Sequence, residues 1–469
     1  MATNNRQLNS TVTFRNSQGI EARGSLIGIT RQTISMEVYD PYSVAQMSEM
    51  LTDLTVRRQG RVVYQGSAVV TSLVNTDIYL VLSATLTEPW KDATEVIGDR
   101  KALREEVDQF LIDLDVYKNV RPEFQLVISR MRTDLSEISR WIEQIDMVAD
   151  ARGVGQSGTL QDEYVDEIKA SVLPHLAQHM SDFEGESRFV PPELSDIHRV
   201  FAQRDLHPLM LRSPFVHRTY VKPLGYAGDY EMVNMMVRNP NEGPSTYFKI
   251  INSLFLAGGP AEAHRNRIVI LLKHLNKQID DAIAIGKTIK ILNLGCGPAV
   301  EIQQLLEQRN IPEAVELTLI DFSQETLDYT YEMITRRLPA HGSGMKLNIV
   351  HRSVDQILRQ SAKIKETDRD TYDFIYCAGL FDYFSQKACS RVLKLFHALV
   401  KPGCWVLSTN VHKDNPAQAS MEYLAEWHLV YRNEKDMQDL IPADWEQNVY
   451  CDKTGVNVFL EYKKAEEDS

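Results

Sequence analysis

A glycine turn between two apolar segments is the stretch of this 469-residue chain whose residue types and spacing point most directly to chemistry. It reads ILNLGCGPAVE at residues 291–301, which predicts a buried strand, a Gly-Cys-Gly turn and the start of a helix. A dinucleotide-binding turn needs a third glycine where this chain has Val300, and a phosphate-binding loop needs a Gly-Lys-Ser/Thr ending that the sequence lacks. The turn therefore predicts a small-molecule site that is neither a dinucleotide-binding turn nor a phosphate-binding loop.

Three further sets of residues follow the next strands that we predict along the chain. Asp321 ends the strand LTLID, 24 residues after Gly297, where a carboxylate can accept hydrogen bonds from ribose hydroxyls. Ser353, Val354 and Asp355 follow the third strand and could bracket the edge of an adenine. The fourth strand, YDFIYC, opens into a loop of small residues that begins with Cys377, Ala378 and Gly379.

This ordered set of motifs resembles the class I S-adenosylmethionine-dependent methyltransferases over about residues 284–469. The resemblance implies S-adenosylmethionine as the cofactor and methyl transfer as the reaction. It places the glycine turn at the amino-acid part of the donor, the acid after the second strand at the ribose, the residues after the third strand at the adenine, and the loop after the fourth strand at the sulfonium. The cofactor-binding residues that it implies are Gly295, Cys296, Gly297, Asp321, Phe322, Ser323, Ser353, Val354, Cys377, Ala378 and Gly379.

Two segments ahead of the donor motifs carry aromatic and charged residues that could serve a methyl acceptor. In residues 216–236, two glycines surround Tyr226 and precede Asp229, which predicts a tight turn that folds over the donor. In residues 261–272, Arg265 and Arg267 stand at the start of an apolar helix, where a cation gains nothing from the helix dipole. We therefore expect these arginines to hold the donor's carboxylate, the acceptor's carboxylate or Asp229.

A third aromatic segment, MEYLAEWHLVYR at residues 421–432, has two interpretations. Tyr423, Trp427 and Tyr431 recur every four residues, as on the core face of a helix. Alternatively, they form a wall of the acceptor pocket, because residues that follow the strands lie at the carboxyl edge of the sheet.

The stretches KPLGYAGDYEM, RNR and the segment from NP to YR are similar to those of the methyltransferases that make 3-hydroxy fatty acid methyl ester quorum signals, over roughly residues 186–469. The resemblance implies O-methylation of the carboxylate of a 3-hydroxy fatty acid or a similar lipid-like small molecule. A carboxylic acid of pKa about 4.5 is ionised at neutral pH, so the site needs a holder and an apolar trough rather than a strong base. Helices over 200–211 and 250–257 could supply the trough.

The residues expected to act on the acceptor fall into two groups. The catalytic candidates are Tyr226, Asp229, Arg265 and His412, and the substrate-binding candidates are Tyr230, His264, Arg267, Phe381, Tyr423 and Trp427. Two alternatives stay open: a methyltransferase acting on another metabolite or a protein, and a non-catalytic S-adenosylmethionine-binding sensor that reports through the N-terminal domain. We expect no metal site.

Residues 11–84 alternate between apolar and polar side chains in short runs, which predicts a small antiparallel barrel or sandwich. The order of strands and the run GRVVYQGSAVV resemble a PilZ domain, a small β-barrel that often binds cyclic di-GMP. That family reads its nucleotide with an RxxxR stretch and a [DN]xSxxG turn, whereas this chain has GITRQTISMEV at the second position. We therefore expect an interaction or dimerisation module that does not bind cyclic di-GMP.

Helical periodicity replaces the strand pattern after Pro89. It predicts helices over 103–117, 124–145 and 164–176, and alternating strands and helices return near residue 284. The predicted fold is multidomain, with a PilZ-like β-barrel, a helical arm and cap, and a Rossmann-like class I methyltransferase domain. The expected boundaries are 1–95 for the barrel, 96–185 for the arm, 186–283 for the cap or substrate segment and 284–469 for the methyltransferase domain.

Composition restricts the partners and the compartment. A net charge of -13 and a pI near 5.5 argue against a nucleic-acid partner. Five cysteines without a CxxC pair, an N-terminus unlike a signal peptide and the lack of an apolar run of membrane-spanning length predict a cytoplasmic protein without stable membrane insertion. The arm or the barrel could form a homodimer contact.

Overall fold

The computed structural model describes most of the chain in two compact units. The described residues are 10–30, 32–38, 45–58, 61–75, 80–88, 100–101, 103–104, 107–108, 111, 116–152, 155–156, 159–338, 344–361 and 369–466. Unit 1 consists of Met1–Ala227, Arg238–Gly258 and Ala417–His428, and unit 2 of Gly228–Val237, Gly259–Pro416 and Leu429–Ser469.

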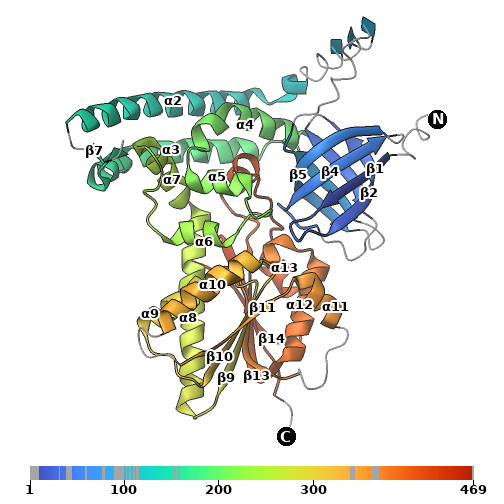
Figure 1. The fold of residues 1–469 in the computed structure, drawn as a ribbon, viewed down its shortest axis with the longest axis vertical. Coiled ribbons are helices and arrows are strands. Elements are labelled where there is room, and N and C mark those ends of the chain that lie inside the picture. The colour runs from blue at the N-terminus through green and yellow to red at the C-terminus, as the bar shows by residue number, and fades with distance from the viewer. Residues whose placement is uncertain are drawn as a thin grey trace. The chain divides into compact units, whose positions relative to one another are not determined.

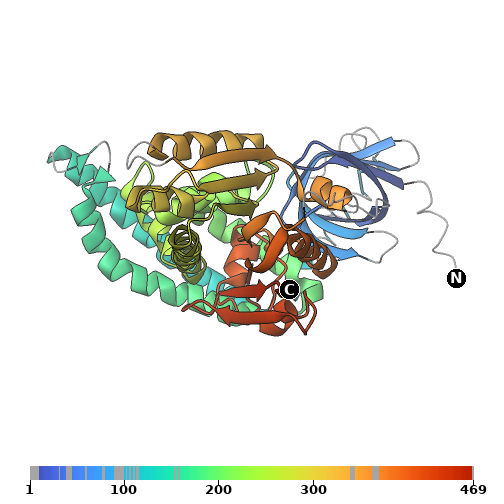
Figure 2. The same cartoon turned by 90° about the horizontal axis from the view of Figure 1, so that it is seen from below.

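Unit 1 begins with a closed antiparallel barrel of strand order β1-β2-β3-β6-β5-β4 (Figures 1 and 2). Along β6 every second side chain is buried, so the apolar face of the strand fills the barrel interior. The predicted barrel is thus confirmed and is compatible with a PilZ-like domain. The strands are β1 Ser10–Arg15, β2 Glu21–Ile29, β3 Thr33–Val38, β4 Met50–Arg58, β5 Arg61–Asn75 and β6 Leu80–Leu86.

Helices make up the remainder of unit 1. The predicted apolar face of residues 124–145 lies on α2, whose buried side chains pack against α3 and α4 in one core. The helix predicted over 103–117 falls largely outside the described residues. The elements are η2 Val116–Asn119, α2 Pro122–Ala151, β7 Gly155–Gln156, β8 Thr159–Leu160, α3 Asp162–Ser187, η3 Pro192–Leu194, α4 Ser195–Met210, α5 Pro214–Val221 and α7 Thr246–Leu256.

The helical interpretation of residues 421–431 is wrong. The chain makes a single π-helical turn, η7 Ser420–Leu424, and Glu426 then adopts a left-handed backbone with φ of 48°. Tyr423 packs inside the helical core, 6.1 Å from the ring of Phe183, and its hydroxyl lies 3.0 Å from Ser195 Oγ. A buried ion pair explains the backbone conformation, because Glu426 Oε1 lies 3.1 Å from Nε of Arg199, which is 2% exposed.

Unit 2 is a doubly wound α/β domain with sheet order β11-β10-β9-β12-β13-β15-β14. The first five strands are parallel, and β15 is antiparallel to β13 and to β14. The four strands that we predicted ahead of the donor motifs are present, as β9 to β12, within a few residues. The strands are β9 Ile289–Leu294, β10 Val315–Asp321, β11 Lys346–His351, β12 Tyr372–Cys377, β13 Val400–Val411, β14 Glu446–Cys451 and β15 Asn457–Lys463.

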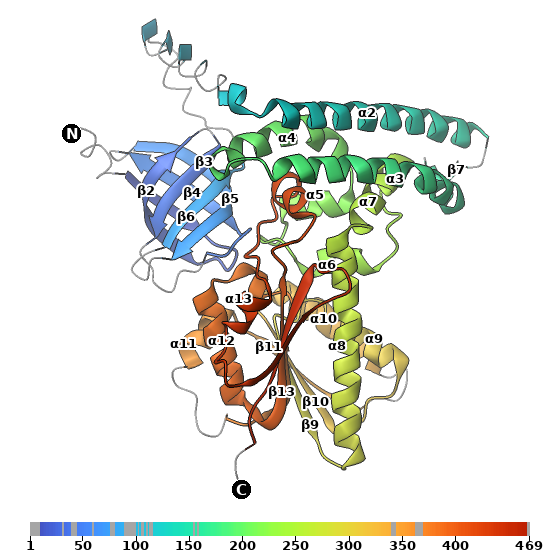
Figure 3. The ribbon, with the colours of Figure 1, turned by 180° about the vertical axis from the view of Figure 1, so that it is seen from behind.

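Two helical layers cover this sheet (Figure 3). One core joins the sheet to α8, α9 and α10, and a second core joins it to α12 and α13. The helices of unit 2 are α6 Tyr230–Val237, α8 Gly259–Ala284, α9 Val300–Gln308, α10 Gln324–Arg337, α11 Val354–Ser361, η6 Phe381–Tyr383, α12 Gln386–Leu399 and α13 Glu434–Gln438. In the described part of the chain, no helix combines the length and the apolar character needed to cross a membrane. The four-part division of the chain stays a prediction.

Candidate active site

The strand order of unit 2 places one edge of the sheet at a topological switch point. From β9 the chain proceeds to β10 and β11 on one side, and then returns to β12 on the other side of β9. Ligands of open α/β sheets bind at the carboxyl ends of the strands beside such a reversal. The four predicted donor motifs follow the carboxyl ends of β9, β10, β11 and β12, so the fold brings them to one edge.

The glycine turn after β9 is held close to the end of β10. The amides of Gly295 and Cys296 both donate to the carbonyl oxygen of Ile320, at 2.8 and 3.1 Å. Gly297 has φ of 51°, and a Cβ placed on it would meet no atom within 4 Å. The turn therefore leaves open space at Gly297, into which a ligand can approach the backbone closely.

Asp321 is fixed at the end of β10 by backbone donors. Its Oδ2 accepts the amide of Gly297 at 3.1 Å, and its Oδ1 accepts the amide of Ser323 at 3.0 Å. Burial raises the pKa of this carboxyl, and hydrogen bonds from the backbone amides of Ser323, Gly297 and Phe322 oppose that rise. A carboxylate has about four acceptor sites, so capacity remains for a further donor such as a ribose hydroxyl. Ser323 is itself fixed, because its side chain caps α10 by accepting the amide of Thr326.

The residues after β11 and β12 complete the edge. Ser353 precedes α11, and its Oγ accepts the amide of Gln356 at 3.2 Å, so Ser353 and Val354 form the first turn of that helix. Cys377 ends β12 and is fully buried. Burial raises the pKa of Cys377 and of Cys296 well above that of an ordinary thiol, so both stay protonated and neither is a nucleophile at neutral pH.

A buried acceptor supports a ligand at this edge. Asn293 lies on β9 just before the glycine turn and is 2% exposed; its Nδ2 donates to Glu301 Oε1 at 3.3 Å. Its Oδ1 has no hydrogen-bond partner among the residues that the structure describes. Buried acceptors are normally satisfied. Asn293, the open Gly297 and the free lone pairs of Asp321 together fit a ligand that carries donors, such as the ammonium and ribose hydroxyls of S-adenosylmethionine.

Arg267 brings a positive charge from α8 to the loop after β12. A Cβ placed on Gly379 would lie 2.9 Å from Nη1 of Arg267. Nη2 of Arg267 lies 2.6 Å from Nδ1 of His264, and burial lowers the pKa of His264 well below its ordinary value, so the imidazole is neutral and accepts this hydrogen bond. Across the described ranges, no carboxylate forms an ion pair with Arg267 within 4 Å. The guanidinium is thus free to receive an anion.

Two acids act on Arg267 from farther away, and the sequence did not single them out. Burial lowers the pKa of Arg267. The negative charge of Asp382, in the loop after β12, raises this pKa, and that of Glu301 on α9 raises it less. Burial raises the pKa of Asp382 to about 6, although the amide of Val411 donates to it. Nothing in the local sequence distinguishes these acids from solvated ones, because their roles follow from burial.

The other acceptor candidates within unit 2 take separate positions. Asp229 is buried and accepts the amide of Met232 in the first turn of α6, while Arg265 contacts Glu262 and the carbonyl oxygen of Met236. The hydroxyl of Tyr230 donates to Glu325 at 3.1 Å.

His412 and Phe381 lie near the ends of β13 and β12. Nε2 of His412 lies 3.1 Å from Glu434 Oε2. Phe381 is completely buried in the core beside α12, so its side chain serves packing. Tyr226, Tyr423 and Trp427 belong to unit 1.

A family model described as a methyltransferase domain matches residues 291–403, which span the glycine turn, Asp321 and the loop after β12. These residues form a methyltransferase domain. The match confirms the predicted enzyme class, an S-adenosylmethionine-dependent methyltransferase, and leaves the acceptor open. No curated protein matches the chain.

Solved structures similar to this chain include three with low identity. A possible exported protein from Bordetella parapertussis is 15% identical, with a TM-score of 0.40, over 55% of this chain and 88% of that one. The magnesium protoporphyrin IX methyltransferase of Synechocystis PCC 6803, with bound SAH, is 10% identical (TM-score 0.32; 44% and 84% covered). The N-methyltransferase NodS of Bradyrhizobium japonicum WM9, in complex with S-adenosyl-L-homocysteine, is 13% identical (TM-score 0.29; 44% and 88% covered). At these scores the likeness carries no argument about the substrate of this chain.

Proposed function

We propose that this methyltransferase transfers the methyl group to the carboxylate of a lipid-like acid, such as a 3-hydroxy fatty acid, and forms a methyl ester. The observation that carries the proposal is the unpaired guanidinium of Arg267 against Gly379. Asp382 and Glu301 act on this cation only from beyond 4 Å, so a bound carboxylate would be its first direct anionic partner, beside the loop assigned to the cationic sulfonium. A carboxylate bound there would be held by Arg267 with an oxygen directed at the reacting methyl.

S-adenosylmethionine supplies an electrophilic methyl group on a sulfonium. The side chains of unit 2 then have positioning roles in the proposal. Asp321 accepts the ribose hydroxyls, Asn293 Oδ1 accepts a donor from the amino-acid part, and Ser353 with Val354 borders the adenine. No strong base is required, since a carboxylate is already ionised at neutral pH. His264, kept neutral by its surroundings, orients Arg267 through the 2.6 Å contact.

Unit 1 contains a pocket beside one of the two helices from which we expected an apolar trough. Its volume is about 600 Å³, a size suited to a small molecule. One wall is α4, where we expected an apolar trough over residues 200–211, and Phe248 of α7 contributes to another. The two arginines of the lining already pair with Asp205 and Glu143. The lining consists of Val200, Gln203, Arg204, His207, Pro208, Leu211, Arg212, Tyr220 and Phe248.

The test uses the full chain, S-adenosylmethionine and a series of 3-hydroxy fatty acids, with the matching amides as uncharged controls. We expect S-adenosylhomocysteine and methyl ester to form in equal amounts with the acids, and no product with the amides. Arg267→Met should raise the acceptor KM while leaving the donor Kd near that of the wild type. A matched control is Arg265→Met, which removes a guanidinium already paired with Glu262.

Three results would contradict the proposal. Methylation of the 3-hydroxyl would show that the acceptor atom is wrong. Loss of donor affinity in Arg267→Met, with an unchanged acceptor KM, would assign Arg267 to the carboxylate of the donor. Donor binding without turnover on any acid would favour another acceptor or the sensor.

A further inference from the structure

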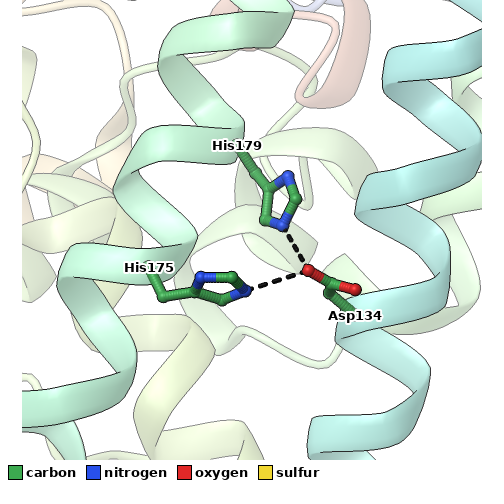
Figure 4. A group of neighbouring side chains, drawn as sticks. All are labelled: Asp134, His175 and His179. Carbon is green, nitrogen blue, oxygen red and sulfur yellow. Dashed lines mark hydrogen bonds and ion pairs between the residues drawn. The ribbon is translucent and has the colours of Figure 1, made fainter.

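Two histidines and an aspartate, none of which was assigned a role in methyl transfer, meet between α2 and α3 of unit 1 (Figure 4). His175 and His179 lie one turn apart on α3, so both rings point from the same face of the helix. Their Nε2 atoms lie 2.9 and 2.7 Å from Oδ2 of Asp134 on α2. We call these three residues the α2–α3 cluster.

The cluster has the donor atoms of a transition-metal site. Its three ligand atoms all lie within 4.8 Å of one another. Imidazole nitrogen and carboxylate oxygen bind Zn²⁺ at about 2.0–2.2 Å, so two ligands of a tetrahedral ion are separated by about 3.3 Å. The present contacts to Asp134 need to open by roughly half an ångström to admit such an ion.

The surroundings of the cluster permit that small movement. His179 is anchored, with its side chain 13% exposed, whereas the side chains of His175 and Asp134 are 57% and 38% exposed and can shift toward solvent. The helices behind the cluster are fixed by buried side chains, including Met131 and Leu135 on α2. The open side leaves room for water as a fourth ligand.

Charge also favours a cation here. In the part of the chain that the structure describes, Asp134 has ion-pair contacts with the two histidines, and no lysine or arginine neutralises it. A divalent ion would supply the missing positive charge and replace the two hydrogen bonds with stronger ligand bonds.

From this geometry we infer that His175, His179 and Asp134 bind one divalent transition-metal ion of the zinc class, which joins α2 to α3. The ion would have three protein ligands and at least one water. The ion would link the two helices of unit 1. It would also stabilise the fold, because an ion that binds the folded chain and not the unfolded chain favours the folded state. This site departs from the sequence-based expectation of no metal.

A second group of possible ligands, His412, Glu434 and Cys451 in unit 2, provides an internal comparison. Burial and the carboxylate of Glu434 raise the pKa of Cys451 to about 12, so its thiol holds its proton at neutral pH. Nδ1 of His412 already accepts the amide of Asp414 at 3.0 Å. We therefore expect the α2–α3 cluster to be the stronger site.

The test is a titration of Zn²⁺ into the metal-free full chain, produced without a histidine tag and followed by calorimetry. The wild type should bind one equivalent at the cluster, and its melting temperature should rise. His175→Ala and His179→Ala should each weaken that binding by about tenfold or more, and the double variant should lose both the equivalent and the thermal shift. His217→Ala, which alters an exposed histidine on α5, and His412→Ala should retain both.

Helix content and melting temperature in chelator show whether each variant is folded. If the double variant does not fold, the single variant His175→Ala tests the site. The side chain of His175 is the most exposed of the three, so its removal should disturb the fold least. Wild-type protein that binds no Zn²⁺ would overturn the inference. So would a folded His175→Ala variant with the stoichiometry, affinity and thermal shift of the wild type.

Discussion

Replacing Asp321 by alanine should weaken donor binding by an amount that can be worked out from its contacts. The carboxylate accepts the backbone amides of Gly297, Ser323 and Phe322 and keeps capacity for a ribose hydroxyl. Losing one or two such hydrogen bonds to a partly buried ribose costs about 1–3 kcal/mol. Asp321→Ala should therefore raise the Kd for S-adenosylmethionine by about 5- to 150-fold.

Calorimetric titration of the donor is the assay, with the melting temperature of the ligand-free protein measured in parallel. The two amides would lose their acceptor, so a modest drop in melting temperature is expected. Asp328→Ala, which removes an exposed carboxylate from α10, is the charge-matched control and should leave the Kd unchanged. An unaltered donor Kd in folded Asp321→Ala would refute the placement of the ribose at β10.

Three further predictions concern strain, pH and the barrel. Gly379→Ala should weaken donor or acceptor binding, because the added Cβ would lie 2.9 Å from Nη1 of Arg267 and the residue has φ of 93°. The control is Gly286→Ala, at φ of 67°, where the added Cβ would meet no atom within 4 Å. It should lower only the stability, by about 1–2 kcal/mol of backbone strain, seen as a lower melting temperature. Burial raises the pKa of Glu426, but Arg199 and a hydrogen bond from His428 outweigh burial and lower it to about 2. The stabilisation from this low pKa is fully present above pH 4.5, the ordinary value, and should be lost as the pH falls toward 2. Denaturant titrations should show that Glu426→Gln lowers the free energy of unfolding by about 3–5 kcal/mol at neutral pH. The variant should also lose the change in stability between pH 4.5 and pH 2. Cyclic di-GMP titrated into the full chain should show no micromolar binding, because the β2–β3 turn lacks the acid, serine and glycine of nucleotide-binding PilZ domains. In this turn the amide of Thr30 donates to the carbonyl oxygen of Thr33 at 2.8 Å. A clear binding isotherm would contradict this prediction.

The sequence predicted the α/β domain well because its strands are short buried runs bounded by turn residues. The glycine turn and Asp321 were found for the same reason, since each stands directly after such a run. The error at residues 421–431 comes from a contact that the local sequence does not show. Its aromatic spacing imitates a helix, but the chain turns at Glu426 to reach Arg199, far away in the sequence.

Contacts between distant segments explain what the sequence left open at the candidate site. Arg267 was one of three neighbouring basic residues, and nothing local predicted that its guanidinium would lie against Gly379. The spacing of His175 and His179 could have been read from PHLAQHM, but their partner Asp134 lies on another helix. Such residues become recognisable only when the fold shows which side chains lack a partner.

A crystal structure of the full chain with S-adenosylhomocysteine would test the central claim most directly, because it locates the donor without depending on the acceptor. We predict density for the amino-acid part at Gly295–Gly297, for the ribose at Asp321 and for the adenine beside Ser353 and Val354. Density for the ligand elsewhere in unit 2, or a fully occupied ligand whose ribose does not contact Asp321, would contradict the assignment of the donor site to the switch point between β9 and β12.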